Sequence, residues 1–183
     1  CLAMATGMPV HLENIRQGRK KPGLMRQHLT SVHAAQTVCN GQVQGAGIGS
    51  TELFFTPGQV SGGNYHFAVG TAGSAGLVLQ TVLPVLLTAE QESDLLMEGG
   101  THNPYSPPFD FLKQSYLQAL QHMGVSCQAE IESYGFYPVG GGRFRVQVSP
   151  AGRAKVLELM EKSDLFKMAA TACVSRLSRD ISN

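Results

Sequence analysis

Asn64-Tyr-His-Phe-Ala-Val69, followed by the run Gly73-Ser-Ala-Gly-Leu-Val-Leu-Gln-Thr-Val-Leu-Pro-Val-Leu-Leu-Thr88, is the stretch that decides the fold class. Tyr65, Phe67 and Val69 alternate with other residues, which is the period of a half-buried strand. The run after it is almost wholly apolar and too long for a strand, so it predicts a buried helix over 73–88. A second strand is expected over 94–98. A strand, a helix and a strand in succession indicate an α/β fold, with helices packed on a sheet.

The same order of elements continues in both directions from this stretch. Downstream, the pattern predicts a helix over 109–123 and strands over 125–134 and 143–148, which completes one β-α-β-α-β-β unit. Upstream, it predicts a strand over 10–16, a helix over 24–39 and strands over 42–49 and 51–56, which is the same unit without its start. Repetition on this scale predicts an α/β (α+β) fold built from similar modules.

The segment after Ala151 gives two conflicting signals. Val156, Leu157, Leu159 and Met160 have helical spacing, whereas 165–174 is an apolar, strand-like run. The residues alone leave both interpretations open.

Composition limits the classes of function. The chain has 183 residues, a formal net charge of +1 and a pI of about 7.9, which argues against a protein that coats nucleic acid with a broad basic face. No apolar run has the length and purity of a membrane span, so no membrane partner is expected. The four cysteines lie far apart without a CxxC pair, which favours a reducing, cytoplasmic setting. The sequence starts at Cys1 without a signal peptide and stops at Asn183, and we expect both ends to be cut.

Positive charge is concentrated in one short segment. Arg16, Arg19, Lys20, Lys21 and Arg26 are five of the fourteen Lys and Arg residues, and no acid lies among them. Gly and Pro mark the segment as a turn that leads into a helix. Guanidinium groups beside a helix N-terminus suit phosphate, but a solvated basic loop is an equally good interpretation of this segment alone.

Three further segments are candidates for a binding site. The small residues of 71–76 either let a phosphate approach the backbone or allow close packing, and packing is the favoured interpretation. The loops 99–108 and 135–142 are rich in Gly and Pro and follow or join strand ends, where α/β folds often bind ligands. Gln80 interrupts the apolar helix, as a structural link or as a ligand contact. The six histidines do not cluster at metal-ligand spacing, so no metal held by the protein is expected.

Taken together, these segments resemble the RNA 3′-terminal phosphate cyclases, in the bacterial form of that family. The resemblance rests on motifs that occur in the family's order over nearly the whole chain: Arg16-Gln-Gly-Arg19, Lys21-Pro-Gly-Leu-Met-Arg26-Gln-His28, Gly70-Thr-Ala-Gly-Ser74, Leu79-Gln80-Thr-Val-Leu-Pro84, Gly99-Gly-Thr-His-Asn-Pro104, Pro107-Pro108, Gly135-Phe-Tyr-Pro138 and Gly140-Gly-Gly142. It implies that 1–154 are cyclase core, with a partial first and a complete second repeat. Residues 155–183 are then the start of a third repeat or of a smaller inserted domain, and form strands rather than a helix.

The resemblance also implies an enzyme of the ligase class that acts in RNA processing. In that family a histidine attacks ATP to form an adenylyl-enzyme, AMP passes to an RNA 3′-phosphate, and the neighbouring 2′-hydroxyl displaces AMP to close a 2′,3′-cyclic phosphate. ATP is the co-substrate, Mg²⁺ or Mn²⁺ accompanies it, and RNA with a 3′-phosphate end is the partner.

By the same resemblance, Arg16, Arg19 and Gln27 bind phosphate or the RNA end, and Gln80 and Pro107 line the ATP pocket. None of the histidines matches the family's nucleophile, so no catalytic residue is assigned, and the chain is expected to be an inactive fragment. The alternatives are a non-catalytic, cyclase-like RNA-binding protein of ribosome assembly and a sugar-phosphate transferase of related architecture. The physiological RNA and the oligomeric state are left open.

Overall fold

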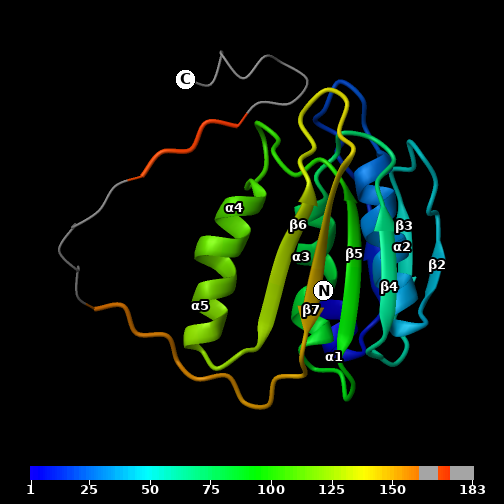
Figure 1. The fold of residues 1–183 in the computed structure, drawn as a ribbon. Coiled ribbons are helices and arrows are strands. Elements are labelled where there is room, and N and C mark those ends of the chain that lie inside the picture. The colour runs from blue at the N-terminus through cyan, green and yellow to red at the C-terminus, as the bar shows by residue number, and fades with distance from the viewer. Residues whose placement is uncertain (161–168, 174–183) are drawn as a thin grey trace.

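Two consecutive units of secondary structure make up the computed structural model, which describes residues 1–160 and 169–173 (Figure 1). The first unit contains α1 (Leu2–Thr6), β1 (Val10–Leu12), α2 (Arg26–Cys39), β2 (Gln42–Gln44) and β3 (Leu53–Thr56). The second contains β4 (Asn64–Ala68), α3 (Ala75–Leu86), β5 (Ser93–Gly99), a helix in three parts, and the strands β6 (Cys127–Ser133) and β7 (Gly142–Val148). The three parts of that helix are α4 (Phe109–Phe111), the π-helical turn η1 (Leu112–Tyr116) and α5 (Leu117–His122).

Each unit forms one sheet, and the two strand orders correspond. The second sheet has the order β4-β5-β7-β6, in which β4 and β5 are parallel and the other pairs antiparallel. The first sheet has the order β1-β3-β2, which is the same arrangement without a counterpart of β4. The predicted repeat, complete once and once without its start, is therefore confirmed, as is the mixed α/β class.

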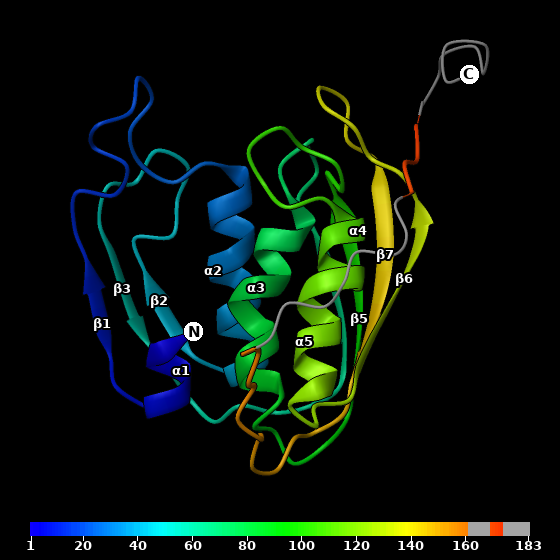
Figure 2. The same ribbon diagram turned by 90° about the vertical axis from the view of Figure 1, so that its left-hand side faces the viewer.

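The helices lie between the two sheets, and α2 packs against α3 (Figure 2). Helix α3 forms the centre of the core because its side chains are apolar on nearly every face. Six of its Val and Leu side chains are fully buried: Val78, Leu79, Val82, Leu83, Val85 and Leu86. Burying each such side chain contributes roughly 1.5–3 kcal/mol. The apolar run that predicts this helix therefore also accounts for the joining of the two units.

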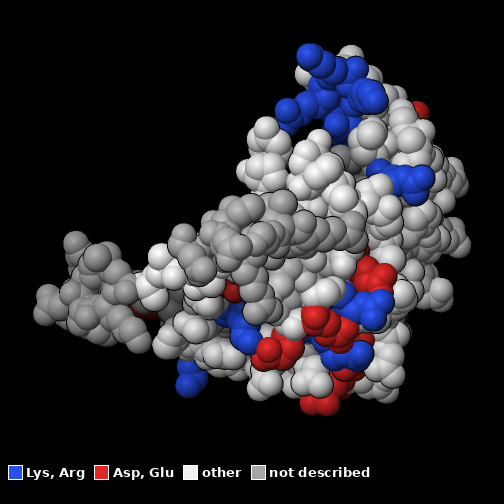
Figure 3. Space-filling view, turned by 45° about the horizontal axis from the view of Figure 1, so that its top comes forward, with Lys and Arg blue, Asp and Glu red and all other residues white. Residues whose placement is uncertain are grey.

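Strand β7 shows why the second sheet has one buried face and one solvent-exposed face. Phe144, Val146 and Val148 are buried against the helices, whereas Arg143 and Arg145 project from the other face. There they form ion pairs with carboxylates of the neighbouring strands: Glu98, Glu132 and Asp94. Red and blue groups are accordingly mixed in the lower part of Figure 3.

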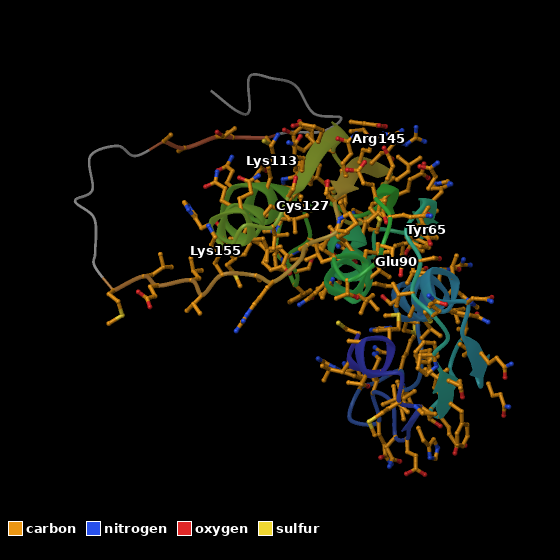
Figure 4. All side chains as sticks on the ribbon, turned by 90° about the horizontal axis from the view of Figure 1, so that it is seen from below. Tyr65, Glu90, Lys113, Cys127, Arg145 and Lys155 are labelled. Carbon is orange, nitrogen blue, oxygen red and sulfur yellow. The ribbon has the colours of Figure 1, made fainter. Side chains whose placement is uncertain are left out.

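Seen from below, Cys127 of β6 and Arg145 of β7 lie on opposite sides of this sheet (Figure 4). Cys127 is 1% exposed, and burial raises the pKa of its thiol to about 11. A thiol in such surroundings is an inert core residue.

Two predicted strands end well before their predicted last residue, and one predicted helix is interrupted. The strand expected over 10–16 ends at Leu12, because Asn14 (φ 54°) and Arg16 (φ 55°) take left-handed conformations. The strand expected over 42–49 ends at Gln44, because Gly45 (φ 80°) turns the chain. The helix expected over 109–123 does form, but a π-helical turn interrupts it.

The segment after β7 contains no regular structure over 149–160. It runs beside the second unit through two backbone hydrogen bonds, from Ala151 N–H to the Leu87 carbonyl and from Lys155 N–H to the Met123 carbonyl (both 2.8 Å). Neither the helix nor the strand considered for 156–160 forms there. Of the strand-like run 165–174 only 169–173 are described, and they form no strand; the rest lies outside the described residues. No helix in the described part of the chain is long and apolar enough to span a membrane.

Candidate nucleotide and phosphate site

The basic segment forms an exposed loop between β1 and α2, at the top of the molecule in Figure 2. Arg19, Lys20, Lys21 and Arg26 are exposed, and none of them forms an ion pair with a carboxylate among residues 1–160 and 169–173. In Figure 3 a group of Lys and Arg side chains stands apart at this end of the molecule. Cations without internal partners are available to an anionic ligand.

Arg16 has a different role from the other cations of the loop. Its Nη1 donates to the carbonyl oxygens of Lys21 (2.8 Å) and Gly23 (2.7 Å), and so closes the loop on itself. Gly23 N–H in turn donates to the Ile15 carbonyl (2.8 Å). Arg16 therefore shapes the loop and brings its own positive charge to the base of it, while Arg19 extends from it.

The start of α2 carries His28 and Gln27 close to this loop. His28 Nδ1 accepts from Met25 N–H (3.2 Å), which caps the helix. Burial, and then the neighbouring Arg16 charge, lower the pKa of His28. Gln27 Oε1 accepts from Ser74 N–H (2.7 Å) at the start of α3, and so joins the helix that follows the basic loop to the helix of the second unit.

The three candidate loops around 71–76, 99–108 and 135–142 come together into one cluster. Gly100 N–H donates to the Gly73 carbonyl (2.8 Å), and Asn103 Nδ2 donates to the Ala72 carbonyl (2.8 Å). Thr101 and His102 N–H both donate to the Gly135 carbonyl, at 2.9 and 3.1 Å. Segments that are far apart in the sequence thus come together at one end of the second unit.

The glycines of this cluster allow the close approach of one loop to another. A Cβ on Gly100 would lie 2.2 Å from the Ala72 carbonyl oxygen, and one on Gly140 would lie 2.8 Å from the Thr71 carbonyl oxygen. Several N–H groups at the start of α3 are also used within the protein, since Ser74 N–H binds Gln27 and Ala75 N–H binds the Gly100 carbonyl. This supports the packing interpretation of 71–76 over direct phosphate binding.

A mainly apolar cavity of about 160 Å³ opens between α3 and the helix that begins at Phe109. Gln80 and Pro107, which the family resemblance assigned to one ATP pocket, both line this cavity. The Gln80 side chain is exposed and forms no hydrogen bond within the described residues, so it is not the buried structural link considered from the sequence. Its amide is instead available at the wall of an otherwise apolar cavity.

The π-helical turn contributes to this cavity. Phe111, Leu112 and Tyr116 lie in or beside the turn and line the cavity together with Phe109. A π turn widens the helix locally and is frequent at functional sites. The regular apolar spacing of 109–123 gave no indication of this turn.

His102 is a further residue that the sequence analysis did not select. Its Nε2 lies 2.8 Å from Asp110 Oδ2 and its Nδ1 lies 2.9 Å from Thr101 Oγ1, while the rings of Tyr134 and Phe136 lie 5.2 Å away. Thr101 lines the cavity, so His102 connects the cavity to the loop cluster and to the start of α4. In the sequence, this contact is indicated only weakly, by Asp110 in the first helical turn after the loop that contains His102.

The structure therefore relates the predicted residues through one chain of contacts. Arg16 and Arg19 belong to the basic loop, Gln27 joins the following helix to the start of α3, and Gln80 lies further along α3 beside Pro107. The Gln27–Ser74 hydrogen bond thus connects α2, which follows the cationic loop, to α3, which lines the apolar cavity. Such a combination suits a ligand with a flat apolar part and a phosphate part.

The fold and this site define a modular α/β protein with features suited to a phosphorylated ligand. A family model described as RNA 3′-terminal phosphate cyclase matches residues 1–181. The chain belongs to the RNA 3′-terminal phosphate cyclase family.

Three curated relatives carry that same description. The chain is 44% identical over 182 residues to one from Koribacter versatilis, 46% over 174 residues to one from Ectopseudomonas mendocina, and 48% over 177 residues to one from Ralstonia nicotianae. These alignments cover 100%, 95% and 96% of this chain and 51% of each relative. The chain thus spans about half the length of the curated relatives it matches.

Proposed function

We propose that the protein to which this chain contributes converts an RNA 3′-phosphate end to a 2′,3′-cyclic phosphate, using ATP through adenylyl-enzyme and RNA-adenylate intermediates. The observation that carries the proposal is that Gln80 and Pro107 line one cavity, while Gln27 joins the framework of that cavity to the basic loop. Family membership supports the RNA 3′-phosphate as the substrate.

In this proposal the apolar cavity takes the adenine base. Aromatic and aliphatic side chains surround a flat ring, and the Gln80 amide offers both a donor and an acceptor to its polar edge. The exposed guanidinium of Arg19 forms a bidentate contact with phosphate, and Arg16 supplies charge from the base of the loop. We assign the nucleophilic histidine to no residue of this chain.

Divalent metal is expected to arrive with the ATP phosphates. Arg16, Arg19, Gln27, Gln80 and Pro107 include no carboxylate, which is the side chain that Mg²⁺ and Mn²⁺ prefer, so this residue set does not fit a metal held by the protein. We therefore derive no step of the reaction from a metal ligand in this set.

The first test of the proposal uses Arg19→Ala. Loss of a bidentate phosphate contact is expected to weaken binding of a 3′-phosphorylated oligoribonucleotide by about 1.5–3 kcal/mol, with little effect on folding because the side chain is exposed. Fluorescence anisotropy measures the affinity and thermal unfolding measures the stability. Arg153→Ala, also at an exposed arginine, is the matched control.

Equal RNA affinity of Arg19→Ala and the wild type would contradict the assignment of Arg19.

The adenylylation step is tested on the full-length gene product with labelled ATP. Protein-bound AMP that is acid-labile and alkali-stable supports a histidine phosphoramidate. RNA binding without any covalent AMP would favour the non-catalytic RNA-binding alternative, and covalent AMP on the 183-residue chain alone would contradict the assignment of no nucleophile within it.

A further inference from the structure

A histidine and two glutamates gather on the outer face of the first sheet, away from the site described above. His11 Nε2 lies 2.8 Å from Glu52 Oε1 and 4.0 Å from Glu13 Oε1. One ligand atom from each of the three residues lies within 4.8 Å of the other two. The sequence alone does not indicate this group, because Glu52 is far from His11 along the chain.

Strand pairing holds the three residues in place. In the β1–β3 register, His11 is opposite Phe54 and Leu12 is opposite Leu53, so the residues that follow and precede these, Glu13 and Glu52, meet at the end of the pair. Like charges in directly opposed positions destabilise a pair of strands. The two opposed glutamates therefore destabilise the β1–β3 pair unless a positive charge lies between them.

That positive charge is not supplied by lysine or arginine. Among the described residues, Glu13 and Glu52 form ion pairs only with His11, although the basic loop begins three residues after Glu13. The His11 imidazole brings a single nitrogen, Nε2, to the two carboxylates.

Stacking on a neighbouring aromatic side chain fixes the orientation of the His11 ring. His11 stacks on Phe54 with ring centroids 3.8 Å apart and an interplanar angle of 10°. This contact points Nε2 toward the carboxylates and limits rotation of the ring. The side chains of His11, Glu13 and Glu52 are 38%, 65% and 55% exposed, so water can complete the coordination of an ion bound among them.

We propose that His11, Glu13 and Glu52 bind one divalent transition-metal ion, such as Zn²⁺ or Mn²⁺, through one imidazole nitrogen and two carboxylate oxygens. Imidazole with carboxylates favours such ions over Mg²⁺ and Ca²⁺, which prefer oxygen ligands alone. The bound ion neutralises the opposed glutamates and ties β1 to β3 at the base of the basic loop. The proposal needs neither ATP nor RNA and stands independently of the proposed function.

The test begins with chelator-treated protein titrated with Mn²⁺, and the loss of the free-ion signal is followed by electron paramagnetic resonance. Mn²⁺ is the first probe because it prefers oxygen and nitrogen ligands to the exposed thiols of Cys1 and Cys173. The wild-type chain is expected to bind one ion saturably. His11→Ala and Glu52→Gln are expected to lose this binding, whereas His33→Ala, at an exposed histidine on α2, retains it.

Thermal unfolding separates loss of the site from loss of the fold. Zn²⁺ is expected to raise Tm of the wild type, because an ion that binds only the folded state stabilises it, and to leave Tm of both variants unchanged. Without metal, Glu52→Gln is expected to have a Tm at or above that of the wild type, since it removes the repulsion. Absence of saturable Mn²⁺ or Zn²⁺ binding by the wild type, or unchanged binding in both variants, would overturn the proposal.

Discussion

Around the basic loop, single side chains hold the site together through hydrogen bonds to the backbone. Arg16 closes the basic loop, His28 caps α2, and Gln27 reaches the start of α3. Each of these residues lies in a motif that was selected for its chemistry, yet each has a structural partner. Among the residues predicted to bind phosphate, Arg19 is consequently the one best suited to test ligand binding without loss of local structure.

His28 links this region to pH. Its pKa is lowered in the folded protein, so the folded state binds fewer protons than the unfolded state once the pH falls below the ordinary histidine value of 6.5. The free energy of unfolding is therefore expected to fall as the pH drops below about 6.5 and to be insensitive to this group above it. Urea unfolding between pH 5 and pH 8, about the range in which histidine titrates, measures this dependence.

A variant isolates the contribution of this histidine to the pH dependence. His28→Gln keeps an acceptor near Met25 N–H but does not titrate, and it is expected to have a shallower dependence than the wild type. His33→Ala serves as the control because its side chain is exposed. Identical pH profiles for the wild type and His28→Gln would show that His28 does not contribute.

At the scale of elements, the site depends on three loops that interlock through glycine. Gly100→Ala is expected to destabilise the protein by about 1–3 kcal/mol, because its Cβ would meet the Ala72 carbonyl oxygen at 2.2 Å and the Asn103 side chain at 2.3 Å. Gly152→Ala is the matched control, since nothing lies within 4 Å of a Cβ there. Chemical denaturation measures both, and equal stability of the two variants would contradict the interlocking of the loops.

Proline inside α3 has a separate effect on the element that carries Gln80. Pro84 has no N–H, so the Gln80 carbonyl cannot receive the usual bond from the residue four positions later. The helix ends soon afterwards, at Leu86. Gln80 thus has a backbone carbonyl without its usual helical donor, in addition to a polar side chain.

The elements that could be predicted were those with a clear hydrophobic period. The alternation of apolar residues predicted β7, and the length of the apolar run predicted α3. The order of the predicted elements then indicated the repeat. The short strands β1 and β2 were predicted too long because left-handed residues such as Asn14 and Gly45 end them, and hydrophobic period does not report backbone conformation. The π-helical turn was missed because its residues keep an apolar helical spacing.

Some of the neighbours in the candidate site were predicted from the sequence, and others were not. Gln80 and Pro107 were selected through the family resemblance, and the structure shows that they line one cavity. The aromatic contacts of His102 and the meeting of His11 with Glu52 were not predicted, because these partners are far apart along the chain. Strand register and loop packing create these groups, and neither is readable from spacing alone.

On the scale of the molecule, the buried centre of the second unit is β5 with α3 beside it. Strand β5 pairs with β4 on one side and β7 on the other, and α3 covers it. Amide hydrogen exchange is therefore expected to be slowest in β5 and α3 and faster in β1, β2 and β6, which lie at sheet edges. Exchange followed by mass spectrometry measures this order, and faster exchange in β5 than in β6 would contradict it.

The strand order β4-β5-β7-β6 has a consequence for synthesis on the ribosome. A chain that emerges from its N-terminus presents β4, α3 and β5 early, but β5 must wait for Gly142–Val148 before its second edge is paired. Until then β5, which contains Leu95 and Met97, has open backbone groups along one edge that other nascent chains can pair with. The order of translation thus leaves this edge of β5 open while residues 100–141 are made, and the interlocked glycine loops cannot assemble before that interval ends.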